Sequence, residues 1–422
     1  MYVSLRDRPA GPDSRAAVPA GRIGATVVLL GLVSMFTDVS SEMVAAVLPL
    51  YLTAHVGLGI VAYGFMDGLY QGVSALVRIA GGYAGDRGGR PKWVAAAGYS
   101  LSAASRLAML PAQGLVAITA VVTADRLGKG LRTAPRDALI AAAAPPHRLG
   151  RAFGVHRALD TAGAVAGPLL AFALLAAVPG GYGSVFTVSF AFAVIGVAVL
   201  VLFVPDRRSA PAAQRLRPVG LVRELTGPRL RRPLLVAGLL GVLTVGDGFL
   251  YLVLQQRDAV GAGFFPLLYV ATNAVYLCLA VPLGRLADRV GRARVLVAGH
   301  VALLVAYLVA AGVPGVAAAF VVPALLGAFY AATDGVLAAL VSRLVAPPAR
   351  GSGIAAAQTV VALARFASSV GFGSLWLVAG PQAAVVVMAA LLAVALPVAA
   401  RLVRDVDRQS VAQPRDDAAV PL

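Results

Sequence analysis

Apolar segments of 18–31 residues recur along the chain, with short polar stretches between them. A helix needs about 20 residues to cross the hydrocarbon core of a bilayer, so each segment is long enough to span one. The pattern predicts twelve membrane-spanning helices and an all-α fold. The predicted spans are residues 23–53, 59–83, 93–112, 115–143, 152–177, 184–204, 233–256, 263–284, 295–313, 316–342, 353–377 and 383–400.

Composition agrees with a polytopic membrane protein. Of the 422 residues, 59% are hydrophobic and 13% are charged, whereas soluble proteins carry about 25% charged residues. A net charge of +17 would suggest nucleic acid as the partner of a soluble protein, but here the position of the charges matters more than their sum. The single Cys278 and four scattered His residues exclude a disulfide framework and a Cys/His metal site. We expect no cofactor and no nucleic-acid partner.

The basic residues lie almost entirely on one side of the predicted membrane. Of the 36 Lys and Arg residues, 27 fall on the two tails and the even-numbered loops, whereas the opposite loops hold Arg257 alone. By the positive-inside rule, both termini and the long central loop are predicted to be cytoplasmic in a cell membrane. The arginines of these loops are expected to contact anionic lipids.

The central loop, residues 205–232, divides the chain into two halves of six spans each. The halves are residues 23–204 and 233–400, and the tails are residues 1–22 and 401–422. The motif GGYAGDRGGR around Asp86 returns as PLGRLADRVGR around Asp288, 202 residues later. Two parallel repeats with a substrate held between them near the midplane are a known plan for transporters.

A charge-rich stretch, DRLGKGLRTAPRD, begins at Asp125 within the fourth span. Asp125, Lys129, Arg132 and Arg136 follow helical spacing and share one face of the helix. Ionisable residues inside a span cost a few kcal/mol, so they are usually functional or mutually paired. We expect Asp125, Arg126 and Lys129 to lie at cavity depth, where they take part in proton coupling by tuning the acids of spans one and two. Arg132 and Arg136 are expected to lie nearer a cytoplasmic gate.

Carboxylates in the first two spans are the candidate proton carriers. Asp38 and Glu42 lie one helical turn apart, so their mutual repulsion favours proton uptake by one of them. The alternative is permanent neutralisation of both by Arg106 or Lys129. Asp67, in the second span, heads a polar stripe on an apolar helix and is the third candidate.

Polar and charged residues in other spans are candidates for the substrate cavity, although Arg106 could instead snorkel towards the outer surface. The second half holds fewer charges than the first, which suggests proton chemistry in the first half and substrate recognition in the second. The candidates are Gln71, Arg106, Arg157, Asp160, Asp247, Asn273, Tyr330, Asp334, Gln358 and Arg365.

The repeated loop motif resembles the G-x-L-A-D-R-x-G-R signature of the major facilitator superfamily, and the resemblance covers nearly the whole chain. It implies two six-helix halves, alternating access, a monomer and a gating latch. The latch residues would be Gly82, Asp86, Arg87, Arg90, Gly284, Asp288, Arg289 and Arg292, with Arg132 and Arg136 beside them.

Two further matches to this family concern coupling. Arg126 and Gly130 match its R-x-x-x-G pattern, whose Arg controls protonation of a nearby carboxylate in proton-coupled relatives; a static tie between Arg126 and an Asp is the alternative. Gly163, Gly167 and Pro168 match the first half of the family's antiporter signature, but its closing Gly-Gly is absent. Small residues allow close helix packing.

The chain also resembles a narrower bacterial subgroup that carries FTDVSSEM and DRLGKGLRTAPRDALIA, whose members are mostly described as efflux or metabolite transporters. The expected function is therefore proton-driven export of a small organic compound. One alternative is a proton symporter or exchanger of an anionic metabolite. A membrane enzyme or sensor on a transporter scaffold is the remote alternative, because no nucleophile–base pair, metal cluster or phosphate loop supports it.

Overall fold

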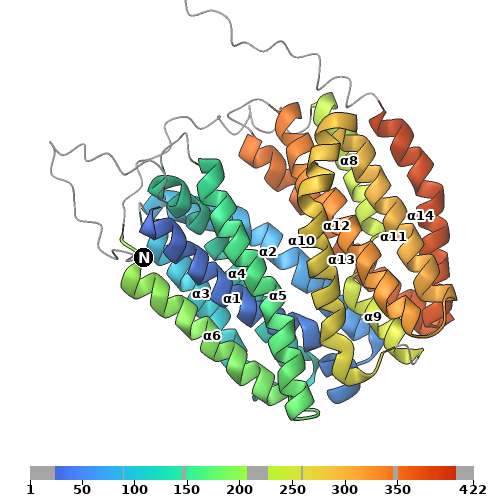
Figure 1. Cartoon of the computed structure of the whole chain (residues 1–422), viewed down its shortest axis with the longest axis horizontal. Helices are drawn as coiled ribbons and strands as arrows, with labels where there is room; N and C mark the ends of the chain where they lie inside the picture. The colour runs from blue at the N-terminus through green and yellow to red at the C-terminus, as the bar shows by residue number, and fades with distance from the viewer. Residues whose placement is uncertain are drawn as a thin grey trace, which may run out of the picture. The chain divides into compact units, whose positions relative to one another are not determined.

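The computed structural model describes residues 24–88, 90–144, 149–206, 227–257, 260–345 and 350–404. The N-terminal tail, most of the central loop and most of the C-terminal tail lie outside these ranges. The described residues are helical and contain no strand (Figure 1). The helices are α1 (Ala25–Leu50), η1 (Tyr51–His55), α2 (Ile60–Gly88), α3 (Pro91–Ala108), α4 (Gly114–Ala143), α5 (Leu149–Ala177), α6 (Tyr182–Phe203), α8 (Pro228–Val242), α9 (Asp247–Gln256), η3 (Ala262–Phe264), α10 (Phe265–Val290), α11 (Arg292–Gly312), α12 (Val316–Leu344), α13 (Arg350–Ala379) and α14 (Pro381–Val403).

The all-α prediction is confirmed, and so is the set of twelve spans. Among the described residues, nine helical segments are long and apolar enough to cross a membrane. The other three predicted spans correspond to helices α2, α3 and α4, which do not meet this criterion of length and hydropathy. The seventh predicted span, 233–256, differs in one respect, because the structure breaks it into α8 and α9.

The chain forms two compact units. The first consists of Met1–Tyr51 and Leu76–Ala212, and the second of Leu52–Ala75 and Ala213–Leu422. Helix α2 contributes to both, because its first part, up to Ala75, groups with the second unit.

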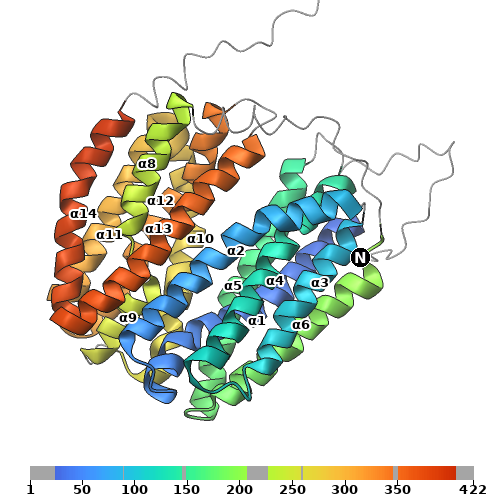
Figure 2. The same ribbon diagram turned by 180° about the vertical axis from the view of Figure 1, so that it is seen from behind.

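Within the first unit, α1 packs against α5 and α6, while α3 packs against α4 and α6. The apolar core between these helices includes Leu30, Tyr99, Ile140 and Leu200, all almost completely buried. Within the second unit, α12 lies against α10 and α11, α14 lies against α11, and α13 lies against α8 (Figures 1 and 2).

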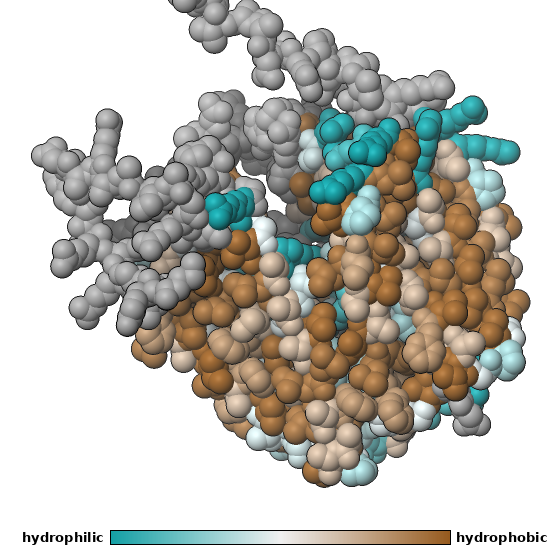
Figure 3. All heavy atoms as spheres, in the orientation of Figure 1, coloured by the Kyte–Doolittle hydropathy of each residue, from teal (hydrophilic) through white to brown (hydrophobic). Residues whose placement is uncertain are grey.

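The outward-facing surface of the helices is apolar. Val116 is 84% exposed and Val378 is 86% exposed, a costly arrangement in water but the expected one in lipid. Figure 3 shows that hydrophobic residues cover most of the visible face, while hydrophilic residues collect near one end of the helices. In the second unit, exposed arginines lie near the ends of α10, α11, α12 and α14: Arg285, Arg289, Arg294, Arg343 and Arg401.

Glycines let α5 approach α1 closely. A Cβ atom added at Gly163 would collide with the backbone carbonyl oxygen of Met35, and one added at Gly167 would lie 2.7 Å from that of Val39. Backbone oxygens cannot move aside as a flexible side chain can. The interface between α1 and α5 therefore depends on the absence of side chains at these two positions.

We expect Gly163→Ala to lower the stability of the purified protein by about 1–3 kcal/mol, the usual range for overpacking. The measurement is the apparent melting temperature in detergent. Gly371→Ala is the matched control, because Gly371 lies in helix α13 with open space where its Cβ would be. There the gain in helix propensity should leave the melting temperature unchanged or higher. Equal melting temperatures for the two variants would contradict the packing argument.

Candidate functional site

Asp125 is the centre of a buried ion network in the first unit. Its Oδ1 atom lies 2.8 Å from the Arg106 Nη2 atom of α3, and its Oδ2 atom pairs with the guanidinium of the adjacent Arg126. Asp125 and Arg126 are each 2% exposed. A buried carboxylate with two cationic partners is stabilised in its ionised form, and the pair between α3 and α4 fixes the two helices against each other.

Arg106 also reaches α1. Its Nε and Nη2 atoms donate to the hydroxyl oxygens of Ser40 and Ser41, at 3.4 and 3.2 Å. Only 5% of Arg106 is exposed, so it does not snorkel towards the outer surface as the sequence also allowed. The arginine turns inward because the Asp125 carboxylate and two hydroxyl groups satisfy its charge there.

The lower part of α4 is held by hydrogen bonds to α3. Arg132 donates to the Ser102 hydroxyl at 2.7 Å and lies over the Tyr99 ring, 4.7 Å from its centroid. Gly98 and Gly128 make this approach possible, because each presents its backbone where the other helix would otherwise meet a side chain. Arg132 is thus buried between helices, with 3% exposure.

Farther along α4, Arg136 connects to α1. It pairs with Asp137 at 2.9 Å and donates to the Ser34 hydroxyl at 3.4 Å. The same hydroxyl lies 2.8 Å from the Nε2 atom of His156 on α5. His156 is therefore engaged by a serine, and these contacts join α1, α4 and α5.

Asp38 and Asp160 bring two carboxyl groups together. They lie on α1 and α5, within hydrogen-bonding reach of each other. Lys129 of α4 and Glu42 of α1 act electrostatically on the same group. Asp160 also pairs with Arg157 at 3.4 Å. A hydrogen bond between two carboxyl groups requires a proton on one of them. The sequence placed Asp160 and Arg157 in the substrate cavity; in the structure Asp160 contacts the proton candidate Asp38, and Arg157 contacts Asp160.

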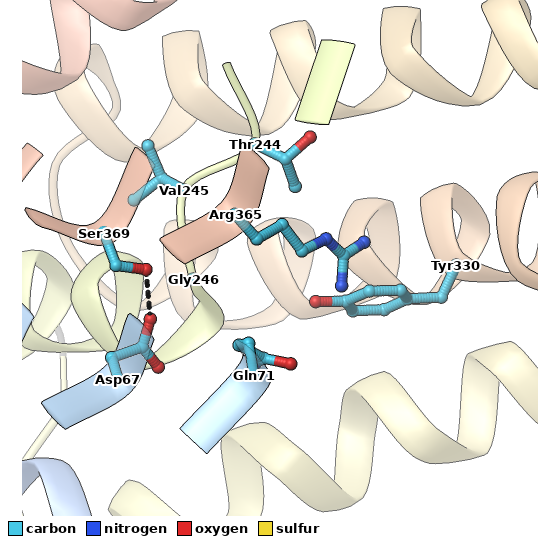
Figure 4. Close-up of a pocket in the computed structure, with 8 residues that line it drawn as sticks. All are labelled: Asp67, Gln71, Thr244, Val245, Gly246, Tyr330, Arg365 and Ser369. Carbon is cyan, nitrogen blue, oxygen red and sulfur yellow. Dashed lines mark hydrogen bonds between the residues drawn. The ribbon is translucent and has the colours of Figure 1, made fainter. Parts of the chain in front are cut away.

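The second unit holds a separate polar pocket with about 210 Å³ of empty volume. Asp67 accepts a hydrogen bond of 2.6 Å from the Ser369 hydroxyl of α13. The guanidinium of Arg365 lies over the ring of Tyr330, with 5.5 Å between its Cζ atom and the ring centroid. Figure 4 shows this guanidinium extending away from the Asp67–Ser369 hydrogen bond. The lining residues are Asp67, Gln71, Thr244, Val245, Gly246, Tyr330, Arg365 and Ser369.

The interruption between α8 and α9 supplies one wall of this pocket. Residues 243–246 leave the helix, so backbone groups there lose their usual partners. The hydroxyl of Tyr307, on α11, replaces two of them by accepting from the Val245 nitrogen at 2.7 Å and donating to the Leu243 oxygen at 2.8 Å. Helix α9 then begins at Asp247, where an acid is favoured by the helix dipole.

Asp247 is held from a second helix as well. Its Oδ1 atom accepts a hydrogen bond of 2.5 Å from the Tyr330 hydroxyl of α12. Gly246 lies so close to Asp67 that an added Cβ atom would be 2.5 Å from its Oδ2 atom. The break thus places both carboxylates at the start of α9.

The structure brings together only some of the predicted cavity residues. Gln71, Tyr330 and Arg365 line the pocket, and Asp247 reaches it through Tyr330, whereas Asn273, Asp334 and Gln358 do not line it. The sequence analysis did not identify Thr244, Gly246 and Ser369 as pocket residues. Thr244 and Gly246 belong to the sequence TVGDG, in which two glycines flank an acid inside an apolar span. Because glycine disfavours helix, this sequence indicated where the helix could break.

The predicted latch of the second half is a local arrangement at the end of α10. Arg292 pairs with Asp288 at 2.6 Å and donates to the Ala339 carbonyl oxygen of α12 at 2.9 Å. Between them, Gly291 has a φ of 109°, a conformation that favours glycine. Gly284 has open space around it, and Arg289 is exposed.

In the first half, Arg90 is exposed and precedes α3, and Gly82, Asp86 and Arg87 belong to α2. The structure describes the backbone of Gly82, Asp86 and Arg87 but not the side chains of Asp86 and Arg87 or the surroundings of Gly82.

Comparison with known proteins places the chain among transporters. The profile of the Major Facilitator Superfamily matches residues 30–265 and 245–421. An uncharacterised MFS-type transporter of Methanocaldococcus jannaschii is 29% identical over 83% of this chain and 88% of its own length. A protein of Mycobacterium tuberculosis is 28% identical over 92% of this chain and 98% of its own.

Solved structures share the fold at low sequence identity. A POT family transporter in complex with 5-aminolevulinic acid has a TM-score of 0.77 at 12% identity, over 91% of this chain and 97% of its own. The nucleoside transporter NupG has a TM-score of 0.73 at 14% identity, over 89% and 98%. The human organic anion transporter MFSD10 has a TM-score of 0.62 at 17% identity, also over 89% and 98%. Identities this low support the fold alone.

We expect Asp125→Asn to destabilise the protein by about 3–5 kcal/mol, because it leaves two buried arginines without their carboxylate. Thermal unfolding of the purified protein measures the loss. Asp288→Asn is the matched control: it removes an Asp–Arg pair whose carboxylate side chain is 57% exposed, and such pairs contribute about 0–1 kcal/mol. Similar losses in the two variants would refute the structural role of the buried network.

We expect Tyr307→Phe to lower the free energy of unfolding by about 1–3 kcal/mol, because two buried backbone groups at the helix break lose their hydrogen-bond partner. The control is Tyr99→Phe, since the Tyr99 hydroxyl is buried and makes no hydrogen bond with the residues that the structure describes. Removing it should be nearly neutral. If melting temperatures show Tyr307→Phe to be equally neutral, the hydroxyl does not hold the break.

Proposed function

Because the chain belongs to the Major Facilitator Superfamily and is therefore a multi-pass membrane transporter and not an enzyme, we propose that it couples proton movement to the transport of a small organic compound. The proposed mechanism is alternating access, and the proposed direction is export. Asp38 and Glu42 are the proposed proton carriers of the first unit, with Asp160 as their partner.

The observation that carries this proposal is the contact between Asp38 and Asp160. Two carboxylates about 4 Å apart repel by about 4 kcal/mol at the effective dielectric of a protein. Sharing one proton removes most of that repulsion. A pair of carboxyl groups that gains and loses a proton at little cost in free energy is suited to carry protons. Because the two groups lie on different helices, a change in their protonation also changes how strongly α1 and α5 attract each other.

Lys129 and Arg126 are the proposed tuning cations. Both act electrostatically on Glu42, and Lys129 also acts on Asp38. A nearby cation favours the ionised form of a carboxylate, so a movement that separates Lys129 from the acids promotes proton uptake. Asp125 differs from these acids because two arginines pair with it directly. We assign it the task of holding Arg106 and Arg126 in place.

Asp67 is a further candidate proton carrier, in the second unit. Its hydrogen bond from Ser369 stabilises the carboxylate, and its position beside the start of α9 adds the favourable end of a helix dipole. Protonation of Asp67 would weaken both interactions and loosen the first part of α2 from α13.

Export is favoured by the small residues Gly163, Gly167 and Pro168 of α5, which resemble half of the antiporter signature. The proposed location is the cell membrane, with both termini and the basic loops on the cytoplasmic side and anionic lipids against the arginines. The common end of α10, α11, α12 and α14 at which exposed arginines collect supports this orientation. The proposed working form is a monomer.

The second candidate function is proton-coupled symport or exchange of an anionic metabolite. The observation in its favour is the guanidinium of Arg365 in the pocket of the second unit. Whole-cell accumulation separates the directions: dissipating the proton gradient should raise the internal level of an exported compound and lower that of an imported one.

In proteoliposomes, we expect Asp38→Asn to abolish transport driven by a proton gradient while leaving equilibrium exchange of the same solute within about twofold of wild type. An amide cannot carry the proton, but it preserves size and polarity. Solutes are chosen by screening thermal stabilisation of the purified protein at two pH values. Asp206→Asn is the matched control. Asp206 follows α6 and accepts a hydrogen bond from the Trp93 side chain, so it lies outside the proposed proton pair. Undiminished driven transport by Asp38→Asn would refute the proposal.

A further inference from the structure

Arg365 is a buried charged residue that has no role in the proposed proton coupling. It lies on α13, and its neighbours in the pocket come from α2, α12, α13 and the break between α8 and α9, all of the same unit. Its Nε atom is buried and has no hydrogen-bond partner within the described part of the chain. The stacking on Tyr330 fixes the plane of the guanidinium but satisfies none of its N–H donors.

The acids near Arg365 are engaged elsewhere. Asp67 accepts from Ser369, and Asp247 accepts from Tyr330 at the first turn of α9. Neither forms an ion pair with Arg365, although both attract it electrostatically, as Asp334 also does. Buried charges are normally paired, and leaving one unpaired costs several kcal/mol. Among the described residues no carboxylate pairs directly with Arg365, so its buried Nε–H group remains available to an anionic group that enters the pocket.

We propose that Arg365 anchors the carboxylate group of a small organic solute, which makes the transported compound a carboxylic acid or an amino acid. A planar guanidinium offers two parallel N–H donors that match the two oxygens of a carboxylate. The amide of Gln71, on the opposite wall, supplies a neutral donor (Figure 4). This assignment rests on the proposed transport function and names its substrate class.

Size and charge narrow the class. The free space beside Arg365 is small, so in this proposal only the head group of a solute enters it and the remainder of the solute lies outside. A phosphate group would carry about −1.5 to −2 charges, and Asp67 and Asp247 would repel it more strongly than a carboxylate. Asp67 and Asp247 would attract an ammonium group, so amino acids belong to the proposed class of substrates.

The test measures thermal stabilisation of the purified full chain by benzoate, benzamide and phenyl phosphate, which share one ring and differ in the head group. Wild type should be stabilised by benzoate more than by the other two. Arg365→Gln should lose the benzoate effect, with apparent affinity at least about tenfold weaker, and Arg365→Lys should retain only part of it. Arg294→Gln, which removes an exposed arginine of α11, should respond as wild type does.

The unliganded variants provide a second readout. Because Arg365 forms no direct ion pair with a described residue, the melting temperature of Arg365→Gln without solute should equal or exceed that of wild type. A clear fall would identify a structural arginine and overturn the assignment. So would stabilisation of wild type by benzamide or phenyl phosphate as strong as by benzoate, a benzoate effect retained in Arg365→Gln, or no benzoate effect in wild type.

These results are independent of proton coupling, because binding is measured without a membrane or a gradient. If Asp38→Asn transports normally while Arg365→Gln loses binding, the coupling proposal fails and the carboxylate site stands. The reverse pattern removes the carboxylate site and leaves proton coupling in place.

Discussion

The ion pair between Arg106 and Asp125 is the contact on which the first unit depends. It joins α3 to α4, and the two serine hydroxyls that Arg106 also reaches bring in α1. In an apolar surrounding a charge must be neutralised where it lies, so the pair leaves the three helices little freedom to slide. The remaining basic residues of α4 can then contact acids and hydroxyl groups of defined position.

That fixed network gives the nearby carboxyl pair its significance. Asp125 has two cations in direct contact, whereas Asp38 and Asp160 face each other with a lysine acting on Asp38. Two adjacent cations keep the Asp125 carboxylate ionised, whereas two adjacent carboxyl groups favour uptake of a proton by one of them. Both arrangements are built from the same few residue types on adjacent helices, and they differ in the charge of the nearest partner: cations beside Asp125, and a second carboxyl group beside the proposed proton carrier Asp38.

The second unit contains a predicted span that is broken between α8 and α9. Unpaired backbone groups are costly there, and the Tyr307 hydroxyl together with the acids at the start of α9 stabilises the broken ends. Residues 244–246 of this break and Arg365 line the same pocket, so the broken helix supplies one wall of the proposed carboxylate site.

The sequence by itself determined the all-α fold, the twelve spans and the residues that place charge inside them. These follow from local properties: the length of apolar segments, helical spacing and the cost of charge in lipid. It also placed Asp38 and Glu42 on one face, and Gln71, Tyr330 and Arg365 among the cavity candidates. Helical spacing gives the face of a residue but not the neighbour across from it. Only the tertiary structure therefore turned Arg106 inward, joined Asp160 to Asp38, divided the span 233–256 at residues 243–246, and excluded Asn273 and Gln358 from the pocket.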